Sequence, residues 1–381
     1  MSGGPARPGA GVRVEPAEGR SAFRDFLHLP GRLHGDDPDF VAPLLHDVRK
    51  MFDPRAHPFH EHSEVRPFVA YADGRPAGRI AAIHNRNHTA FHDDRTGFFG
   101  FFACEDDPAV AAALFDAAGA WLRERGLDTM RGPASFSTNE EVGLLVEGFG
   151  RPPAVMMPWN PPWYVDLVEG AGFTKAKDLL AFTLDSNVPP DRLVQMERRL
   201  SERLGVTIRP LRMRDFEAEL ERVRELYNRS WERNWGFVPM TDAEIAHMAK
   251  ELKRLLARVP EQVLFAERGG APVGFTLWLL DYNRALRHAR GRLFPFGLLK
   301  ILWHLRGIDF ARVLTLGVLP EERGQGIDSL LIMAIFRHGT ARGVESGEFS
   351  WVLEDNLSML KPLERIGARA YKRYRVYDRP L

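Results

Sequence analysis

The alternation of apolar and polar positions predicts short strands and amphipathic helices in an order that occurs twice along the chain. Residues 70–80 (AYADGRPAGRI) and 266–276 (AERGGAPVGFT) each run from an apolar strand through a glycine turn into a second strand, which is typical of a β-hairpin. Residues 100–139 and 317–356 then share the order strand, turn, amphipathic helix, glycine, strand and asparagine. Two ordered matches of this kind indicate an internal repeat.

A third match closes each half and completes the repeated unit. Residues 164–184 and 359–379 each predict a helix that ends at a glycine, Gly172 or Gly367, followed by a strand. The proline-containing segment 185–191 (DSNVPPD) is typical of a boundary between domains. We therefore expect an α/β protein (α+β in some schemes) built from two copies of one unit. The predicted parts are a disordered lead-in over 1–11, a first domain over 12–185 and a second domain over 186–381.

The two halves differ in where extra residues are inserted. The hairpins are 196 residues apart and the following segments 217 apart, so the second half carries about 21 additional residues between them. These residues fall in 284–307, which combines a long apolar run with several arginines. The first half has its own extra segment, 140–160, directly after Asn139. Insertions in a scaffold often carry function, so we expect substrate contacts in these two segments.

The overall composition excludes several classes of protein. The 52 basic and 51 acidic residues leave a formal net charge of +1, which gives no electrostatic reason to expect nucleic acid as a partner. The hydrophobic content of 44% is ordinary for a soluble globular protein, and no run of about 18 apolar residues predicts a membrane-spanning helix. The only cysteine, Cys104, excludes an internal disulfide, and we expect a cytoplasmic protein.

The segment VLPEERGQGIDSLL, residues 318–331, contains the strongest candidate for a binding loop. Its glycines, Gly324 and Gly326, let backbone N–H groups approach an anion closely, and the helix predicted to follow adds unpaired N–H groups and a positive dipole end. Arg323 and Gln325 add donors at the start of the loop. A pyrophosphate suits this arrangement, although the same residues also fit a plain strand-to-helix turn.

In this context the loop resembles the signature of the GNAT superfamily of acyl-CoA-dependent N-acyltransferases, Gln/Arg-x-x-Gly-x-Gly/Ala after the fourth strand. Arg323 and Gly326 match its arginine and first glycine, and Asn356, a following helix and Gly367 resemble the family's later segment. The resemblance covers the second half well and the first half in outline. It implies two domains, each with a mixed, mostly antiparallel sheet flanked by helices. It also implies direct transfer of an acyl group from acetyl-CoA or another acyl-CoA to the amine of a small molecule.

The same resemblance implies roles for particular residues. The strand before the loop would hold the pantetheine arm through its backbone at Val318, and the loop amides would hold the pyrophosphate. The residues that the resemblance assigns to the cofactor are Val318, Arg323, Gly324, Gln325, Gly326, Ile327 and Asn356. Glu354, near the end of the strand that leads to Asn356, is our candidate general base for catalysis.

Several positions depart from the family pattern. Asp328 stands where the signature has glycine or alanine. A carboxylate there either repels a diphosphate or turns toward the helix N-terminal amides, which is the interpretation we favour. Leu363 stands where many members carry a tyrosine general acid. In the first half, Asp106, Asp107 and Pro108 replace the loop residues and suit a helix N-cap better than a phosphate. We therefore expect one cofactor site per chain, in the second half.

We expect two further segments to contact the substrate or a lipid. Asn228, Trp231 and Trp235 lie in the region that borders the acceptor site in proteins of this family. Aromatic and amide side chains suit a small-molecule pocket, although a packed helix corner would contain them too. Residues 293–306 (LFPFGLLKILWHLR) fit an interfacial helix with weak membrane or lipid contact, a lid over a long acyl chain, or a buried helix with a basic edge.

A series of histidines in the first half has a spacing that could fit a metal site. His84, His88 and His92 have the spacing of one helical face, as metal ligands can have. The preceding RIAAI is strand-like, however, which makes a common helical face doubtful. We interpret these histidines as polar loop residues and predict no metal.

Three functions remain in agreement with the sequence. The leading one is acyl-CoA-dependent N-acylation of a small-molecule amine. A second is a long-chain-acyl or aminoacyl transferase of the same fold, of which the tRNA-dependent form is weakened by the near-neutral charge. The third is a non-catalytic acyl-CoA-binding or scaffold protein, which Leu363 and Asp328 would explain.

Overall fold

The computed structural model describes residues 11–189 and 191–381, so the lead-in predicted for 1–11 lies outside the described residues except for Gly11. The first half contains nine strands and five helices in this described part. Its strands are β1 (Arg13–Pro16), β2 (Ser63–Ala72), β3 (Arg75–Asn85), β4 (Thr96–Cys104), β5 (Thr129–Gly132), β6 (Ala134–Ser135), β7 (Glu141–Val142), β8 (Leu144–Glu147) and β9 (Thr174–Leu184). Its helices are α1 (Gly19–His34), α2 (Leu45–Met51), α3 (Arg86–His92), α4 (Pro108–Arg123) and α5 (Tyr164–Gly170), with a 3-10 turn, η1 (Pro58–Glu61).

The second half repeats this order and adds further helices. Its strands are β10 (Val206–Pro210), β11 (Val263–Arg268), β12 (Ala271–Leu280), β13 (Phe310–Val318), β14 (Ser346–Leu353) and β15 (Arg369–Pro380). Its helices are α6 (Asp191–Leu204), α7 (Phe216–Trp231), α8 (Asp242–Leu256), α9 (Asn283–Leu286), α10 (Gly297–His304), α11 (Ile327–Ala341) and α12 (Leu357–Arg365). Its 3-10 turns are η2 (Met213–Asp215), η3 (Pro260–Gln262), η4 (Arg287–Ala289), η5 (Leu305–Gly307) and η6 (Pro320–Glu322).

The predicted repeat is present in the fold. The hairpins β2–β3 and β11–β12 turn at Asp73-Gly74 and at Gly269-Gly270, and all four residues have φ between 51° and 84°. Two successive left-handed residues form the turn that suits the right-handed twist of a two-residue hairpin. The helix–strand pairs α4–β5 and α11–β14 follow in both halves, and α5–β9 and α12–β15 close them. The three ordered matches in the sequence therefore correspond to three matching structural segments.

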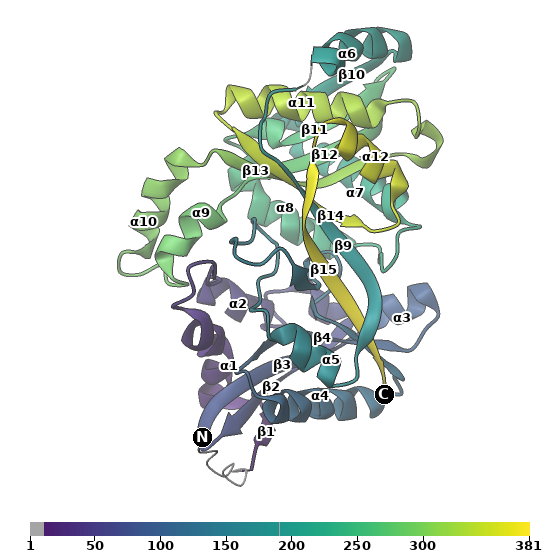
Figure 1. Cartoon of the computed structure of the whole chain (residues 1–381). Helices are drawn as coiled ribbons and strands as arrows, with labels where there is room; N and C mark the ends of the chain where they lie inside the picture. The colour runs from purple at the N-terminus through teal and green to yellow at the C-terminus, as the bar shows by residue number, and fades with distance from the viewer. Residues whose placement is uncertain (1–10, 190) are drawn as a thin grey trace, which may run out of the picture.

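The two halves share one sheet because they exchange their last strands. The strand order is β1-β2-β3-β4-β5-β15-β9-β14-β13-β12-β11-β10. Thus β9 of the first half pairs with β14, β15 of the second half pairs with β5, and β9 and β15 run side by side through the middle of the molecule (Figure 1). Along this path only β4–β5 and β13–β14 are parallel, which confirms the mixed, mostly antiparallel sheet. The domain boundary near 185–191 stays a prediction, and the exchange means that neither half forms its sheet alone.

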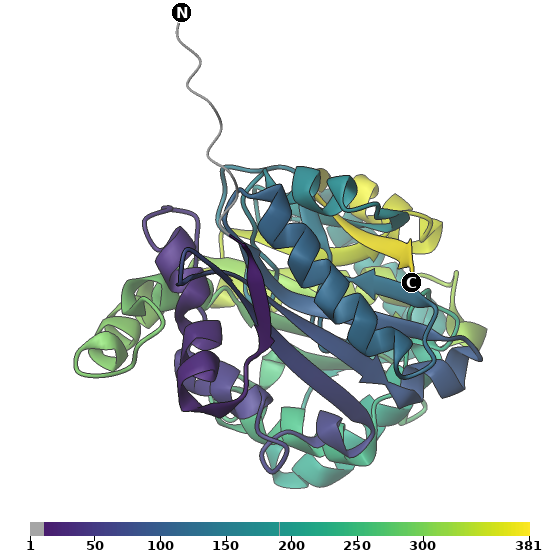
Figure 2. The ribbon, with the colours of Figure 1, turned by 90° about the horizontal axis from the view of Figure 1, so that it is seen from below.

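Helices cover both faces of this sheet, and the side chains of each strand pack alternately against the helices of one face and of the other. In the first half, Ile80 and Ala82 pack with α4, whereas Val69 and Ala81 pack with α1 on the opposite face. Figure 2 shows α4 running across its face of the sheet. In the second half, β11 alternates in the same way between a core that includes α11 and one that includes α7 and α8. The result is a helix–sheet–helix sandwich on both sides of the exchanged strands.

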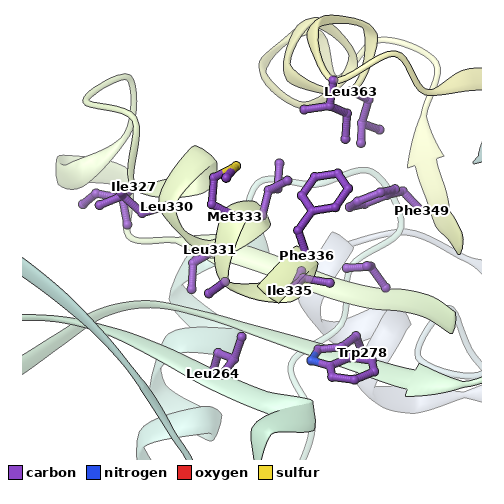
Figure 3. Close-up of a cluster of buried hydrophobic side chains, with 14 of the residues drawn as sticks. Leu264, Trp278, Ile327, Leu330, Leu331, Met333, Ile335, Phe336, Phe349 and Leu363 are labelled. Carbon is purple, nitrogen blue, oxygen red and sulfur yellow. The ribbon is translucent and has the colours of Figure 1, made fainter. Parts of the chain in front are cut away.

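The helix α11 is apolar on nearly all sides because other elements enclose it. Its side chains pack against Leu264 and Trp278 of the sheet and against Phe349 and Leu363 (Figure 3). This packing holds the first turn of α11 at the end of β13, where the predicted binding loop lies. The buried side chains that α11 contributes include Ile327, Leu330, Leu331, Met333, Ile335 and Phe336. No helix that the structure describes is long and apolar enough to cross a membrane.

Candidate functional site

The strands β13 and β14 separate halfway along their length and open a cavity in the second half. Their parallel pairing covers 310–313 and 346–349, after which the two strands diverge. A register shift next to Trp278 leaves Leu314 without a partner on β12, and such a bulge bends the strand where the divergence begins. A cavity of about 390 Å³ occupies the opening, between the diverging strands, the loop into α11 and the start of α12.

The free edge of β13 presents backbone groups to this cavity. The amide of Leu319 donates to the carbonyl of Val273 over 3.0 Å. Because successive residues of an antiparallel strand direct their backbone groups to alternate edges, Val318 directs its N–H and C=O groups away from β12. The Val318 carbonyl accepts a hydrogen bond from Arg323 at 3.1 Å. The Val318 N–H is therefore placed to bind a ligand in the cavity.

The loop between β13 and α11 forms a cradle of backbone amides at the cavity wall. Gly324 and Gly326 have φ angles of 74° and 101°, in the region that favours glycine. Gly326 is the N-cap of α11 and offers no side chain to the first amides of the helix. A Cβ at Gly326 would also lie 2.8 Å from the end of the Leu200 side chain of α6, so a larger residue would require that side chain to move. An uncapped helix start of this kind attracts anions, and the cradle fits a pyrophosphate.

The side chains predicted to bind the cofactor mostly stabilise the loop. Arg323 donates to backbone carbonyls of β13 and α7. Gln325 accepts from Arg268 at 2.8 Å and donates to Glu322 at 3.1 Å, which directs its side chain away from the cavity. The backbone amides are thereby left to bind an anion. The predicted cofactor residues that line the cavity are Val318, Arg323, Gly324, Gly326, Ile327 and Asn356.

Asp328, which departs from the family's loop, lies in the first turn of α11 at the cavity wall. Burial raises the pKa of its carboxyl, and the amides of Ser329 and Asp328, together with Arg365, act in the opposite direction. The contact with helix amides agrees with the orientation that we favoured from the sequence. A carboxyl that is protonated more readily also presents less negative charge to a diphosphate.

The wall of the first cavity contains no tyrosine among the described residues. Leu363, at the position where the family often has one, is fully buried in the core (Figure 3). Tyr371 donates to the buried carboxylate of Glu348, and Tyr374 and Tyr377 are fully buried. A proton for a leaving group would therefore have to come from another donor.

A second cavity, of about 150 Å³, adjoins the first where β13 and β14 diverge. Trp231, Asn234, Leu314, Thr315 and Trp351 line both cavities, so the two meet at this opening. Much of the remaining wall is apolar, and its methionine side chains can change conformation to fit an irregular apolar ligand. The apolar side chains of this wall include Met156, Met240, Met248, Phe237 and Ile245.

The first half of the chain contributes a carboxyl group to this second cavity, and one of its oxygens is buried. Glu140 lines it, with Oε1 3.6 Å from Nε2 of His57 and with Oε2 buried and without a hydrogen-bond partner among the described residues. Burial raises the pKa of Glu140 well above its usual value, and the nearby Glu244 adds to the rise. Burial lowers the pKa of His57 to about 4, with His247 second in effect. A buried carboxyl with an unused acceptor atom suits an N–H donor such as an amine.

The other predicted catalytic and acceptor residues are only partly brought together. Trp231 lines both cavities and Trp235 lines the second, whereas Asn228 lines neither. Glu354, our candidate base, also lines neither cavity, and its Oε2 lies 2.7 Å from Nζ of Lys175. Burial alone raises the pKa of Glu354, but the hydrogen bond with Lys175 and a backbone amide of β9 lower it overall. The structure thus places Glu354 in a surface ion pair, away from both cavities.

The sequence did not predict Glu140 and His57 as site residues, because only the fold brings these two side chains together. One signal pointed toward Glu140: it opens the extra segment 140–160 and follows Asn139, the counterpart of Asn356. Of the two insertions expected to contact substrate, 140–160 borders the second cavity, whereas 284–307 lines neither cavity.

The corresponding opening in the first half is closed. The strands β4 and β5 also diverge after a short parallel pairing, but segment 133–136 fills the gap between them. A Cβ on Gly100 would lie only 2.0 Å from the carbonyl oxygen of Ala134. Asp107 caps α4 and accepts from the amide of Ala109 at 2.8 Å, which confirms the predicted N-cap. The amides that would bind a phosphate are therefore satisfied by a side chain.

The interpretation of His84, His88 and His92 as loop residues is wrong, because all three lie in regular elements, although they do not share one helical face. His84 lies in β3, whereas His88 and His92 lie in α3. His92 hydrogen-bonds to the carbonyl of Phe237 at 2.8 Å. Across residues 11–189 and 191–381, no group of three or more His, Cys, Asp or Glu side chains is arranged to hold a metal ion.

Two known proteins resemble this chain in sequence over nearly its whole length, and a family model matches part of it. The model of the acetyltransferase (GNAT) family matches residues 220–368. The chain is 36% identical over 379 residues to a protein of Caulobacter vibrioides (strain NA1000 / CB15N) called bacterial ceramide synthase, a match that covers 98% of each. It is 38% identical over 372 residues to protein YghO of Escherichia coli (strain K12), which covers 95% of this chain and 94% of that protein.

Solved structures agree at the level of the fold. A tandem GNAT protein from the clavulanic acid biosynthesis pathway superposes with a TM-score of 0.55 at 14% identity, covering 97% of this chain and 98% of that one. A GCN5-related N-acetyltransferase from Sphaerobacter thermophilus gives a TM-score of 0.50 at 15% identity, covering 97% and 95%. Two relatives match nearly the whole chain, and the family model matches a range that contains the glycine loop. The chain is therefore a tandem member of the acetyltransferase (GNAT) family, and so an acyltransferase.

Proposed function

We propose that this chain transfers an acyl group from acyl-CoA to the amine of a long-chain, sphingoid-type molecule and forms an N-acyl amide. The observation that carries the proposal is the meeting of two unlike cavities between β13 and β14. One ends in a cradle of backbone amides, and the other has an apolar wall with a buried carboxyl. The relative called bacterial ceramide synthase supports a long-chain amine, because a ceramide is an N-acylated sphingoid amine. This proposal narrows the small-molecule acceptor expected from the sequence.

The cofactor side of the proposed site uses backbone groups. Acyl-CoA would supply the activated thioester, with its pyrophosphate on the amides that follow Gly324 and Gly326 at the start of α11. The N–H of Val318 would donate to the thioester carbonyl oxygen and stabilise the negative charge that develops there. We keep acetyl-CoA and longer acyl-CoAs as alternatives, and the cytoplasm as the compartment expected from the single cysteine.

The amine side of the proposed site uses Glu140, which takes the role that we first gave to Glu354. An incoming ammonium group would donate to the unused Oε2 of Glu140 and favour its ionised form. Glu140 then accepts a proton from the ammonium, which frees the nitrogen lone pair. The nitrogen attacks the thioester carbonyl carbon, a C–N bond forms, and the C–S bond breaks. The nitrogen loses a second proton as the amide forms, and water carries this proton to the departing thiolate, since Leu363 replaces the usual tyrosine.

The test is a product assay with two amines that share a head group. Sphinganine and 2-amino-1,3-propanediol, its short analogue, are each incubated with the purified protein and with short- and long-chain acyl-CoAs. We expect an amide of sphinganine, detected by mass spectrometry, and little amide of the short analogue. Equal acylation of both amines would refute the long-chain acceptor and leave the acyltransferase intact.

A second candidate function is acyl-CoA binding without turnover. Leu363 at the usual tyrosine position and Asp328 at the cradle favour it. The same assay, combined with calorimetric titration of acyl-CoA, separates the two functions. Binding of acyl-CoA with no amide from any amine would support the non-catalytic alternative.

A further inference from the structure

We propose that residues 283–307, which are the insertion 284–307 with Asn283 before it, dock this protein onto the surface of an anionic phospholipid bilayer together with an arginine-lined cavity beside them. The proposal goes beyond the acyl transfer and does not depend on it. The insertion contains α9, η4, α10 and η5, and it stands out from the side of the molecule in both views (Figures 1 and 2). The helix α10 packs mainly against α9 and η4 of the same insertion.

Large apolar side chains of the insertion face the solvent. Phe294 and Trp303 are each 78% exposed, and Phe296 and Leu299 are 65% and 63% exposed. Leu298 and Leu302 of α10 are exposed as well. Contiguous exposed apolar side chains of this size mark an interaction surface. This exposure excludes a buried helix over 293–306, and no residue of that segment lines either cavity, so the structure gives no support for a lid.

Cations surround these apolar side chains. Residues 283–307 contain five arginines and one lysine, and no acidic residue. Arg284 is paired with Asp281 and Asp309 at the base of the insertion. An apolar helix with aromatic side chains and a basic edge is typical of helices that lie in the interface of an anionic membrane. The remaining cations, all exposed, are Arg287, Arg290, Arg292, Lys300 and Arg306.

A cavity of about 630 Å³ lies where the insertion meets α1 and α2 of the first half. The amide of Leu45 donates to the carbonyl of Gly291 at 3.1 Å and connects the insertion to this wall. Asp25, the acidic residue of the wall, accepts from Tyr71 at 3.2 Å and lies 3.8 Å from Arg32. The arginines that line the cavity are Arg24, Arg32, Arg79, Arg290 and Arg292.

Arg79 indicates that this cavity takes an anion. It is 7% exposed, one of its terminal nitrogens donates to the carbonyl of Phe26 at 2.8 Å, and its Nε is buried without an acceptor among the described residues. Burial lowers the pKa of Arg79 to about 10, so the side chain remains charged at neutral pH. A buried guanidinium with an unused N–H is satisfied by an anionic oxygen, and a phosphate matches its planar fork.

The cavity and the apolar surface adjoin each other, which favours a phospholipid. Arg292 lines the cavity, and the exposed apolar residues begin two positions later, at Phe294. A phosphate head group in the cavity and acyl chains against 294–303 would therefore belong to one lipid. A second copy of this chain fits less well, because a symmetric contact would bring the same unpaired cations together.

The first experiment measures binding of the full chain to vesicles by co-sedimentation. Vesicles of phosphatidylcholine alone are compared with vesicles of phosphatidylcholine mixed with phosphatidylglycerol. We expect binding to the mixed vesicles, weakened by salt, and little binding to the neutral ones. Equal binding to both kinds of vesicle would overturn the head-group part of the proposal, and no binding to either would overturn all of it.

Paired variants locate the surface. Phe294→Ser combined with Trp303→Ser should reduce binding to mixed vesicles at least tenfold. Arg292→Glu should reduce it by more than the roughly fivefold expected for removing one cation near an anionic surface. Val188→Ser and Arg203→Glu, at exposed positions outside the insertion, are the matched controls and should bind like the wild type. Unchanged melting temperatures show that the variants are folded.

Two other outcomes would replace the bilayer with another occupant. Sedimentation velocity that shows a dimer of the wild type, abolished by Trp303→Ser, would assign the surface to a second copy. Calorimetric binding of inorganic phosphate without any binding to vesicles would assign the cavity to a free anion. Either result overturns the docking surface, and neither depends on the acyltransferase assay.

Discussion

The two halves of this chain share one order of elements and differ most at the gap where two parallel strands diverge. In the second half the gap between β13 and β14 is a cavity of about 390 Å³. In the first half the gap between β4 and β5 is filled by 133–136, and Phe136 is fully buried there. The helix that follows is uncapped at Gly326 in one half and capped by Asp107 in the other. The repeated unit provides the scaffold, and a few loop residues decide whether its gap becomes a site.

The closed half still takes part in the proposed chemistry. Its extra segment brings Glu140 to the second cavity, beside His57. The exchanged strands β9 and β15 join the two halves, so that their relative position is fixed by backbone hydrogen bonds. The comparison therefore suggests a division of work, in which the second half binds the acyl donor and the first half supplies the base.

The largest expected effect tests this division directly. Glu140→Gln should lower kcat by roughly 10² to 10⁴, the usual contribution of a general base, while acyl-CoA binding stays unchanged. Glu354→Gln should leave kcat within about twofold, because Glu354 is paired with Lys175 outside both cavities. Steady-state kinetics and calorimetry of both variants measure this. A large loss in Glu354→Gln and none in Glu140→Gln would return the base to the second half.

The next effect concerns the two helix starts. Gly326→Asp should weaken acyl-CoA binding at least about a hundredfold, because a carboxylate would face the pyrophosphate and its Cβ would meet Leu200. The matched change in the first half is Ala109→Asp, 217 positions earlier, which should leave binding unchanged. Calorimetric titration with acetyl-CoA and a longer acyl-CoA gives both values. Equal losses in the two variants would mean that the first half also contributes to the cofactor site.

Part of this asymmetry could be predicted from the sequence, and the limits have physical reasons. The hairpins, the glycine loop and the Asp107 cap follow from local spacing, and the structure contains them. The exchange of β9 and β15 could not be predicted, because local pattern does not decide which strand edge a chain joins. The approach of Glu140 to His57 depends on that long-range arrangement. Gln325 fits the loop pattern, but its contacts with Arg268 and Glu322 exist only in the folded protein.

Acid should destabilise the protein through buried histidines of the first half. The pKa values of His34 and His57 are lowered to about 4, chiefly by burial, so both are neutral when folded. Below about pH 6.5 the unfolded chain binds protons that the folded chain does not, and the free energy of unfolding falls until about pH 4. The loss at pH 5 is about 2 kcal/mol for each histidine. Urea unfolding at several pH values should show a shallower slope for His57→Gln, and an unchanged slope would contradict this.

The smallest expected effect tests whether the Asp107 cap alone prevents the first half from binding a cofactor. Asp107→Ala removes the cap of α4 and should lower the free energy of unfolding by about 1 kcal/mol, measured by urea unfolding. It should not create a second acyl-CoA site, because 133–136 still fills the gap. Asp328→Ala, at the open helix, should instead tighten acyl-CoA binding by about fivefold, since it removes a carboxyl near the cradle. If Asp107→Ala raised the stoichiometry to two, backbone filling would not be what separates the halves, and the capping residue alone would distinguish a closed repeat from an open one.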